Sequence, residues 1–485
     1  MIASAFSDYP VSYPQPTWAE QNPADWWQAV VATTRQLLAK SKARPDDIAV
    51  IGFCGQMQGC LPVDATGRPL RPCIIWADQR AVAQADLLAE RLGEERIFQI
   101  TGHRITPTLS GSKILWLRDH EPEVFAQTHK FLHVKDYVAH CMTGQFVTDR
   151  SDASGMNLYD LERGAWSDEI LQAIELDLDR LPEVHDSTDV IGAVTSEAAA
   201  ELGLRAGTPV VIGGGDGASA AVGAGAVAEG PAYTYIGSSA WISFAASRPI
   251  FDPRRRIFNF AHMVPGLFVP CGTMQAAGGS YRWLRQEVCG LESREADETG
   301  EDVYEVMNRR AAGSPPGARG LLFMPYLQGE RSPHWNPRAR GGFVGLQITH
   351  TRADLIRAVL EGIALNLRAI LEAYLEAGAR IDEVAVIGGG AKGRLLRQIV
   401  ADALGRPVLR PRLLDEATSL GAAIAAGVGI GLFANFSAAR QFNAILERQA
   451  PGPAAQAEYD RLYPLFLAAY EALVPVFNQL NNGRE

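Results

Sequence analysis

The chain has 485 residues, a formal net charge of −10 and an apolar content of 47%, which is ordinary globular composition and argues against disorder. A general nucleic-acid binder carries a basic excess, so that class is disfavoured. Six cysteines without a Cys-x-x-Cys pair are too few for a disulfide framework and indicate a reducing, cytoplasmic setting. No signal peptide opens the chain, and no run of about 18 apolar residues is free of charges and glycine clusters, so we expect no membrane partner.

Short apolar strands alternate with longer amphipathic helices. In chain order the pattern predicts a helix at 26–39, a strand at 48–53, helices at 81–91 and 112–118, and strands at 209–213, 232–236 and 321–325. A long helix at 352–376, a strand at 384–388, a helix at 394–404 and a last helix at 458–480, ended by Asn-Asn-Gly, follow. This alternation predicts an α/β fold with largely buried strands.

Two distant segments are built alike. Residues 211–218 read VIGGGDGA and residues 386–393 read VIGGGAKG, each a strand, three glycines, small residues and then a helix. The likeness predicts two large halves of similar construction. We place a boundary in the small-residue stretch 217–230, which gives domains at 1–218 and 219–485.

The two glycine turns, and a third at Gly237-Ser238-Ser239, could bring backbone amides close to a phosphate. From the residues alone, close packing or an ordinary β-turn explains each of them too. A dinucleotide site needs an acidic residue about 20 positions after the glycines, and neither triple-glycine turn has one, which disfavours a dehydrogenase. No phosphate-binding GxxxxGK[ST] sequence occurs.

Asp216 and a tryptophan-containing segment are candidates for chemistry. Asp216 follows three glycines at the end of an apolar strand, where a carboxylate can take a proton from a bound hydroxyl; a helix N-cap is the alternative. Trp76, Asp78 and Arg80 alternate with period two, so on a strand their side chains would face one way. An indole stacks on a sugar ring, and carboxylate and guanidinium groups bind hydroxyls. An ion pair beside a core tryptophan is the alternative.

A loop and a histidine pair complete the candidates. Gly329–Leu346 is a long charged loop, and loops of that length are commonly functional. His129 and His133 stand four residues apart without an acidic ligand, which predicts a solvated helix face and no metal site.

Together these segments resemble the FGGY carbohydrate kinases, most closely the xylulokinase-like branch, from about Tyr9 to Leu480. The most specific match is Gly329–Leu346, which follows the family signature GERxPxxxPxxRGxxxGL. The other matches are Trp76-x-Asp78-x-Arg80, Lys135-Asp-Tyr137, Gly213-Gly-Gly-Asp216, Gly388-Gly-Gly-Ala-Lys392 and Asp415-Glu-Ala-Thr-Ser-Leu-Gly-Ala-Ala423.

The resemblance implies a two-domain actin-like ATPase fold, with a ribonuclease-H-like core in each domain and a cleft between them. It implies that Asp216 is the general base, that ATP is the phosphoryl donor, and that Mg²⁺ sits on the phosphates with no protein ligand set. The sugar-binding positions it implies are Gln56, Met57, Gln58, Trp76, Asp78 and Arg80. The nucleotide-binding positions it implies are Gly237, Ser238, Ser239, Gly278, Gly279, Gly389, Gly390, Ala391 and Lys392.

Two departures from the family pattern bear on activity. The family opens with a β-hairpin carrying Asp-x-Gly-Thr, whose aspartate organises Mg²⁺, and no such sequence precedes Ile51. We therefore expect the first domain to lack its N-terminal hairpin and the chain as written to be a poor kinase. The family sequence Gln-Met-His-Gly reads Gln-Met-Gln-Gly at 56–59, which loses a titratable ring at Gln58.

The expected reaction is ATP-dependent phosphorylation of a ketopentose such as D-xylulose, to xylulose 5-phosphate. The alternatives are a kinase for another ketose or polyol, or a catalytically impaired binding protein. The expected partner is a small-molecule sugar, with neither nucleic acid nor membrane, and a homodimer is left open.

Overall fold

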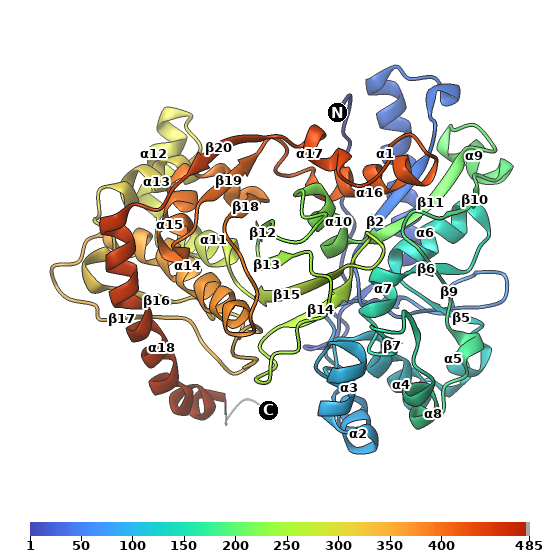
Figure 1. The fold of residues 1–485 in the computed structure, drawn as a ribbon, viewed down its shortest axis with the longest axis horizontal. Helices are drawn as coiled ribbons and strands as arrows, with labels where there is room; N and C mark the ends of the chain where they lie inside the picture. The colour runs from blue at the N-terminus through green and yellow to red at the C-terminus, as the bar shows by residue number, and fades with distance from the viewer. Residues whose placement is uncertain (482–485) are drawn as a thin grey trace.

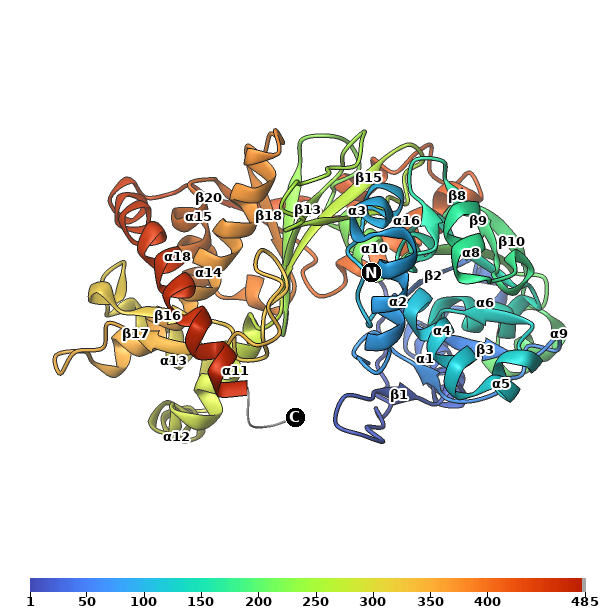
Figure 2. The same cartoon turned by 90° about the horizontal axis from the view of Figure 1, so that it is seen from below.

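The computed structural model describes residues 1–481, which form two lobes (Figure 1). The lobe drawn in blue to cyan holds most residues before 216, and the lobe drawn in yellow to red holds most residues after 270. Seen from below (Figure 2), the lobes meet near β15, α10 and α16. The Asn-Asn-Gly sequence predicted to end the last helix reaches beyond the described residues.

The first lobe is built on a three-stranded sheet with the order β10-β11-β2. Its strands are β10 (Val190–Ala193), β11 (Pro209–Gly215) and β2 (Ile51–Gly55). Strand β11 runs parallel to β2 and antiparallel to β10. The apolar run of β11 is buried, as expected for a central strand.

The remaining strands of the first lobe form two-stranded pairs: β1 (Glu20–Gln21) with β4 (Cys73–Ile74), β3 (Leu61–Val63) with β5 (Lys130–Leu132), β6 (Val147–Asp149) with β9 (Glu183–His185), and β7 (Tyr159–Asp160) with β8 (Ala165–Trp166). Its helices are α1 (Pro23–Ser41), α2 (Val82–Leu92), α3 (Glu94–Thr101), α4 (Ser110–His120), α5 (Pro122–Gln127), α6 (Val134–Thr143), α7 (Arg150–Ser154), α8 (Asp168–Ile174), α9 (Ser196–Leu202) and α10 (Asp216–Gly223).

The second lobe is built on a seven-stranded sheet with the order β14-β15-β13-β12-β18-β19-β20. Its strands are β12 (Ala232–Ile236), β13 (Ala240–Phe244), β14 (Phe258–Ala261), β15 (Phe268–Met274), β18 (Val384–Ile387), β19 (Val408–Pro411) and β20 (Ile445–Gln449). A separate pair joins β16 (Leu322–Met324) to β17 (Gly342–Val344).

The helices after β15 are α11 (Gly278–Glu287), α12 (Gly290–Thr299), α13 (Val303–Ala312), α14 (Arg352–Glu376), α15 (Arg394–Leu404), α16 (Ala417–Gly429), α17 (Ala438–Phe442) and α18 (Pro453–Asn481). The predicted bounds of α14 and α15 are confirmed. Helix α14 is the centre of the largest core because most of its side chains are buried, and a capping box between Thr351 and Asp354 begins it.

The predicted likeness of the two halves is present in the structure. Strand β11 ends in glycines and leads into α10, and β18 ends at Ile387, before Gly388, and leads through a 3₁₀ turn into α15. The two sheets differ at one edge. Strand β18 lies between β12 and β19, whereas β2 has β11 as its one partner in the described sheet.

The small-residue stretch after Asp216 forms helix α10, which packs closely on α16. A Cβ on Gly223 would lie 1.8 Å from the carbonyl oxygen of Ala417, and one on Gly421 would lie 2.0 Å from that of Ser219. Helix α16 also packs on β2 and β11. The chain therefore returns to the first lobe after residue 416, so a single boundary between 218 and 219 does not separate the lobes in space.

Among the described residues, no helix meets the length and apolarity that a membrane span requires.

Candidate functional site

A cavity of about 150 Å³ lies between the lobes, beside Asp216. The first lobe lines it with Gln56, Met57, Gln58, Trp76, Asp216 and Gly217. The second lobe lines it with Tyr233, Ser239, Trp241, Phe258, Phe260, Val269, Cys271, Thr273 and Arg331. Because β2 and β11 are parallel and pair Gly55 with Gly215, their carboxyl ends bring Gln56 and Asp216 to the same edge of the sheet.

Asp216 is the first residue of α10 and remains accessible from the cavity. Its Oδ1 accepts a hydrogen bond of 2.8 Å from the Gly217 amide. Desolvation by the surrounding protein raises the pKa of its carboxyl to about 6, against the opposing effects of backbone amides and of Arg331. The group is thus largely ionised at neutral pH, yet more basic than an ordinary aspartate, as a general base requires.

The loop after β2 supplies three of the predicted sugar-binding residues. The Gln56 side chain donates a hydrogen bond of 2.6 Å to Gln21. Met57 is buried against Phe258 and Phe260 of the second lobe. Gln58 adopts a positive φ of 65°, and its carbonyl accepts a hydrogen bond of 2.8 Å from Lys113.

The prediction of a strand at Trp76–Arg80 is wrong. The segment forms a turn, so its side chains point in different directions. Trp76 is 42% exposed and lines the cavity. Asp78 is fully buried and bonds to the Ala19 amide and to Arg80, whose guanidinium lies 3.7 Å from the ring centroid of Trp18. The structure thus brings Trp76 to the site and turns Asp78 and Arg80 into the first lobe.

An aromatic wall from the second lobe completes the cavity, and the sequence analysis missed it. Trp241 donates a hydrogen bond of 3.0 Å to the Tyr233 hydroxyl, which in turn donates one of 3.0 Å to the carbonyl of Gly217. Phe258 and Phe260 contribute from β14. Trp241 follows the Gly-Ser-Ser turn and could have been noticed, whereas nothing in the sequence near β14 indicates a site.

The predicted phosphate turns lie at the ends of neighbouring strands. Gly237–Ser239 joins β12 to β13, and β12 runs parallel to β18, which is followed by Gly388. The amides of Gly278 and Gly279 donate to the carbonyls of Gly237 and Ser238, both at 2.9 Å. Arg282 also donates to the Ser238 hydroxyl. The glycine pair 278–279 therefore holds the turn in place.

The last predicted turn, Gly389–Lys392, is a 3₁₀ helix beside the Gly237 turn. Gly389 is exposed and Gly390 is partly exposed, whereas Ala391 is fully buried. Lys392 forms an exposed ion pair of 2.6 Å with Asp415. The backbone of this turn, more than the Ala391 side chain, is open to a ligand.

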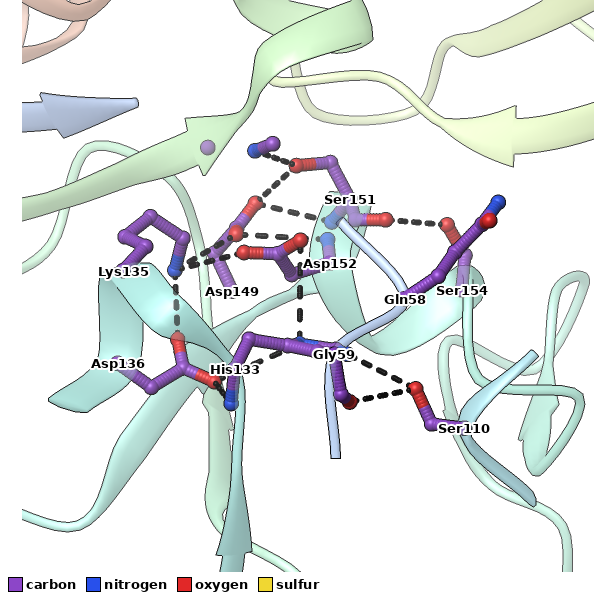
Figure 3. A network of polar contacts seen from close by, with 12 residues as sticks. Gln58, Gly59, Ser110, His133, Lys135, Asp136, Asp149, Ser151, Asp152 and Ser154 are labelled. Atoms are coloured by element: carbon purple, nitrogen blue, oxygen red, sulfur yellow. Dashed lines mark hydrogen bonds and ion pairs between the residues drawn. The ribbon is translucent and has the colours of Figure 1, made fainter. Parts of the chain in front are cut away.

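Beneath the site lies a buried network of charged and hydroxyl side chains (Figure 3). Lys135 contacts Asp136 at 2.8 Å, Asp149 at 3.2 Å and Asp152 at 3.3 Å. Asp149 accepts a hydrogen bond of 2.6 Å from the Ser151 hydroxyl. On the other side of the network, His133 contacts Ser110, whose hydroxyl donates to the carbonyl of Gly59 at 2.8 Å.

The network corrects the prediction for the histidines. His129 is exposed, but His133 is buried and precedes α6 as its N-cap residue, where its Nδ1 lies 3.5 Å from Asp136. Burial lowers the pKa of His133, but Asp152 and Asp136 outweigh that effect and raise it. Burial raises the pKa of Asp152 to about 7 against the opposing charges of Lys135 and His133.

Among residues 1–481 no cluster of His, Cys, Asp and Glu side chains could hold a metal ion.

The charged loop contributes Arg331 to the cavity, and the sequence analysis gave this residue no role. Its neighbour Glu330 is buried and accepts hydrogen bonds from the amides of Gln275 and Arg331 and from the Asn366 side chain, at 2.7, 2.8 and 3.0 Å. Burial raises the pKa of Glu330 to about 8 despite these donors. Desolvation lowers the pKa of Arg331.

Comparisons with known proteins agree with this architecture. The N-terminal domain model of the FGGY family of carbohydrate kinases matches residues 1–223, and the C-terminal domain model matches residues 232–430. A xylulose kinase from Escherichia coli is 35% identical over 87% of this chain and 84% of its own length. A gluconokinase from Bacillus licheniformis is 32% identical over 98% and 92%. A ligand-bound xylulose kinase from Lactobacillus acidophilus superimposes with a TM-score of 0.89 at 27% identity, covering 98% of this chain and 94% of that chain.

The chain belongs to the FGGY family of carbohydrate kinases. It is a carbohydrate kinase with a two-domain α/β fold, and it acts on a small-molecule sugar.

Proposed function

We propose that the chain transfers a phosphoryl group from ATP, with Mg²⁺, to a hydroxyl of a ketopentose such as D-xylulose. The observation that carries the proposal is the position of Asp216, a carboxylate of raised pKa in a cavity lined by both lobes. Relatives named xylulose kinase support the choice of sugar.

Asp216 would accept the proton of the attacking hydroxyl. Trp76, Trp241 and the two phenylalanines of β14 offer apolar faces to the C–H surface of the sugar, and Gln56 and Gln58 offer amide groups to its hydroxyls. With these contacts the attacking hydroxyl would lie beside Asp216, and the apolar side chains would exclude water from it. Positioning and water exclusion are the main requirements of phosphoryl transfer.

The residues present fit a nucleotide on the second lobe. Within residues 1–481 the amides of Ser238 and Ser239 donate to no acceptor, and a turn with free N–H groups at the end of a strand binds anions. Gly389 has open space where a Cβ would stand, so a ligand can approach its backbone. When bound, Mg-ATP supplies the phosphoryl group and neutralises part of its charge.

The identity of the sugar depends on the loop at Gln58. Relatives named gluconokinase match as much of the chain as those named xylulose kinase. We therefore hold a sugar acid beside another ketose or polyol as the second candidate. The glutamine at 58, where the family pattern has histidine, favours a departure from D-xylulose, since an amide differs from an imidazole in reach and donors.

We also propose that residues 1–485 alone turn over slowly. Among residues 1–481, no strand pairs with β2 on the side opposite β11, and a cavity of about 410 Å³ lies between residues 5–9, α1 and the end of β2. The second lobe has the β12–β13 hairpin beside the equivalent strand β18. The family's opening hairpin with its phosphate turn would occupy this position.

The test is release of ADP from Mg-ATP with a panel that includes D-xylulose, D-ribulose, xylitol and D-gluconate. It is run on this chain and on a form extended upstream in frame. Preferred turnover of D-xylulose supports the proposal, and faster turnover by the extended form supports the role of the hairpin. Preference for D-gluconate would replace the sugar assignment, and equal rates in both forms would refute slow turnover.

A further inference from the structure

Arg331 is a cation of the cavity that interacts electrostatically with Glu330 and Asp216 without forming an ion pair with either carboxylate. Within the described residues it forms no ion pair, and its Nε has no hydrogen-bond partner. Two arginines with buried side chains are paired: Arg80 with Asp78, and Arg357 with Glu361. Arg331 is half-buried, and a charge partly removed from water without an ion-pair partner is costly, so a site that keeps one is suited to receive an anion.

The neighbouring glutamate does not serve as that anion. Both carboxylate oxygens of Glu330 are taken by N–H donors, and no contact within ion-pair distance joins them to the guanidinium of Arg331. Glu330 thus holds the backbone at Gln275 and Arg331, and the backbone carbonyl of Arg331 accepts from the amide of Trp335. The arginine is carried by an anchored loop while its guanidinium remains available.

The surroundings of Arg331 indicate which anion it meets. It lines the same cavity as Asp216 and Ser239, and Ser239 belongs to the turn with free amides. Apart from Asp216, the first-lobe side chains that offer hydrogen-bonding groups to the cavity are neutral: the amides of Gln56 and Gln58 and the indole of Trp76. Arg331 therefore belongs with the base and the phosphate turn, at the place where phosphate passes from donor to sugar.

We propose that Arg331 is a catalytic residue that binds the phosphoryl group during its transfer to the sugar hydroxyl. In that step the hydroxyl O–H bond breaks and its proton passes to Asp216, while the sugar oxygen forms a bond to phosphorus. The bond from phosphorus to the β,γ-bridging oxygen of ATP breaks, and its electron pair stays with ADP. Arg331 stabilises the charge on the non-bridging oxygens, as an arginine finger does.

The experiment compares Arg331→Met, Arg331→Lys and the control Arg104→Met, an arginine of the first lobe bonded to the Arg255 carbonyl outside the cavity. The inference rests on the proposed kinase function. Arg331→Met should lower kcat by about 100-fold or more, as loss of a transition-state cation does. The Kd for the sugar without nucleotide should stay within about threefold, because the sugar is not its ligand. Arg331→Lys should recover part of kcat.

A second readout does not depend on turnover. Inorganic phosphate should raise the unfolding temperature of the wild type and of Arg104→Met, and this shift should disappear in Arg331→Met. A wild type that phosphorylates no sugar but shows the Arg331-dependent shift would refute the proposed function and the catalytic role, and would support only phosphate binding by Arg331. Equal phosphate shifts in wild type and Arg331→Met would overturn it. The inference would also be overturned if Arg331→Met lost affinity for gluconate while kcat stayed unchanged. That result would show that Arg331 binds the carboxylate of a sugar acid.

Discussion

The amide of Gly215 donates a hydrogen bond of 2.9 Å to the hydroxyl of Ser151, which ties the end of β11 to helix α7 one residue before Asp216. The same hydroxyl donates to Asp149, which faces Lys135. The position of the general base is therefore connected to the buried ionic network of the first lobe.

Replacement of Ser151 by alanine should lower kcat without weakening sugar binding. The variant leaves a buried amide at Gly215 without its acceptor, and displacement of Asp216 by a fraction of an ångström reduces proton transfer. We expect kcat to fall by about tenfold, with a smaller change in the Kd for the sugar.

Thr148→Val is the matched control for Ser151→Ala. Thr148 is buried beside Asp149, but its hydroxyl has no hydrogen-bond partner among the described residues. Its removal should leave kcat unchanged. An equal loss in both variants would show that general loosening of this region, rather than the bond to Gly215, controls the rate.

Asp216→Asn should abolish most of the activity while the sugar still binds. General base catalysis contributes about 10² to 10⁴ in rate, so a loss in this range is expected in kcat. In the wild type, kcat/KM should fall about tenfold per pH unit below the pKa of Asp216, near pH 6, because only the ionised carboxylate accepts a proton. A pH-rate profile from pH 5 to 8 measures this, and an unchanged rate down to pH 5 would contradict the assignment.

Lys135→Met should destabilise the fold in a pH-dependent way. Removal of the ammonium leaves Asp136, Asp149 and Asp152 buried without their cation, at a cost of about 3 to 5 kcal/mol in the free energy of unfolding. Loss of the ammonium raises the pKa of these carboxyl groups in the folded state. At higher pH they are charged without a cation, which lowers the free energy of unfolding. As the pH falls they bind protons, and this loss of stability becomes smaller. Urea unfolding at pH 5 and pH 7.5 should show the larger loss at pH 7.5.

Lys113→Met is the control for this pH dependence. Lys113 is also buried, but its ammonium donates to the carbonyls of Gln58 and Ile75. Carbonyl oxygens do not titrate, so acid should not recover the stability that this variant loses. If both variants regained stability at pH 5, the pH dependence would not come from Asp136, Asp149 and Asp152.

Gly278→Ala should weaken ATP use. A Cβ at this position would lie 2.4 Å from the carbonyl oxygen of Gly237, so the Gly237–Ser239 turn has to move. We expect the KM for ATP to rise by about tenfold while the sugar Kd is retained. Gly290→Ala at the start of α12, where a Cβ meets nothing within 4 Å, should behave like the wild type.

The amino-acid sequence alone indicated the strands β2, β11, β12, β16 and β18, the long helices, the three small-residue turns and the position of Asp216 after β11, but not β13, β14, β15, β19 or β20. These features depend on local periodicity and on the backbone freedom of glycine, and both can be read along the chain. The family pattern also followed from local motifs, including the loop that carries Arg331.

Which side chains face the cavity depends on how the chain folds in three dimensions. Trp76 reaches it while Asp78 and Arg80 turn inward, because a turn, unlike a strand, has no fixed alternation of faces. The aromatic wall of β14, the burial of His133 and the return of α16 to the first lobe join segments far apart in sequence. Such contacts arise when whole elements pack to bury apolar surface and pair buried charges, so their partners are chosen by the assembled fold.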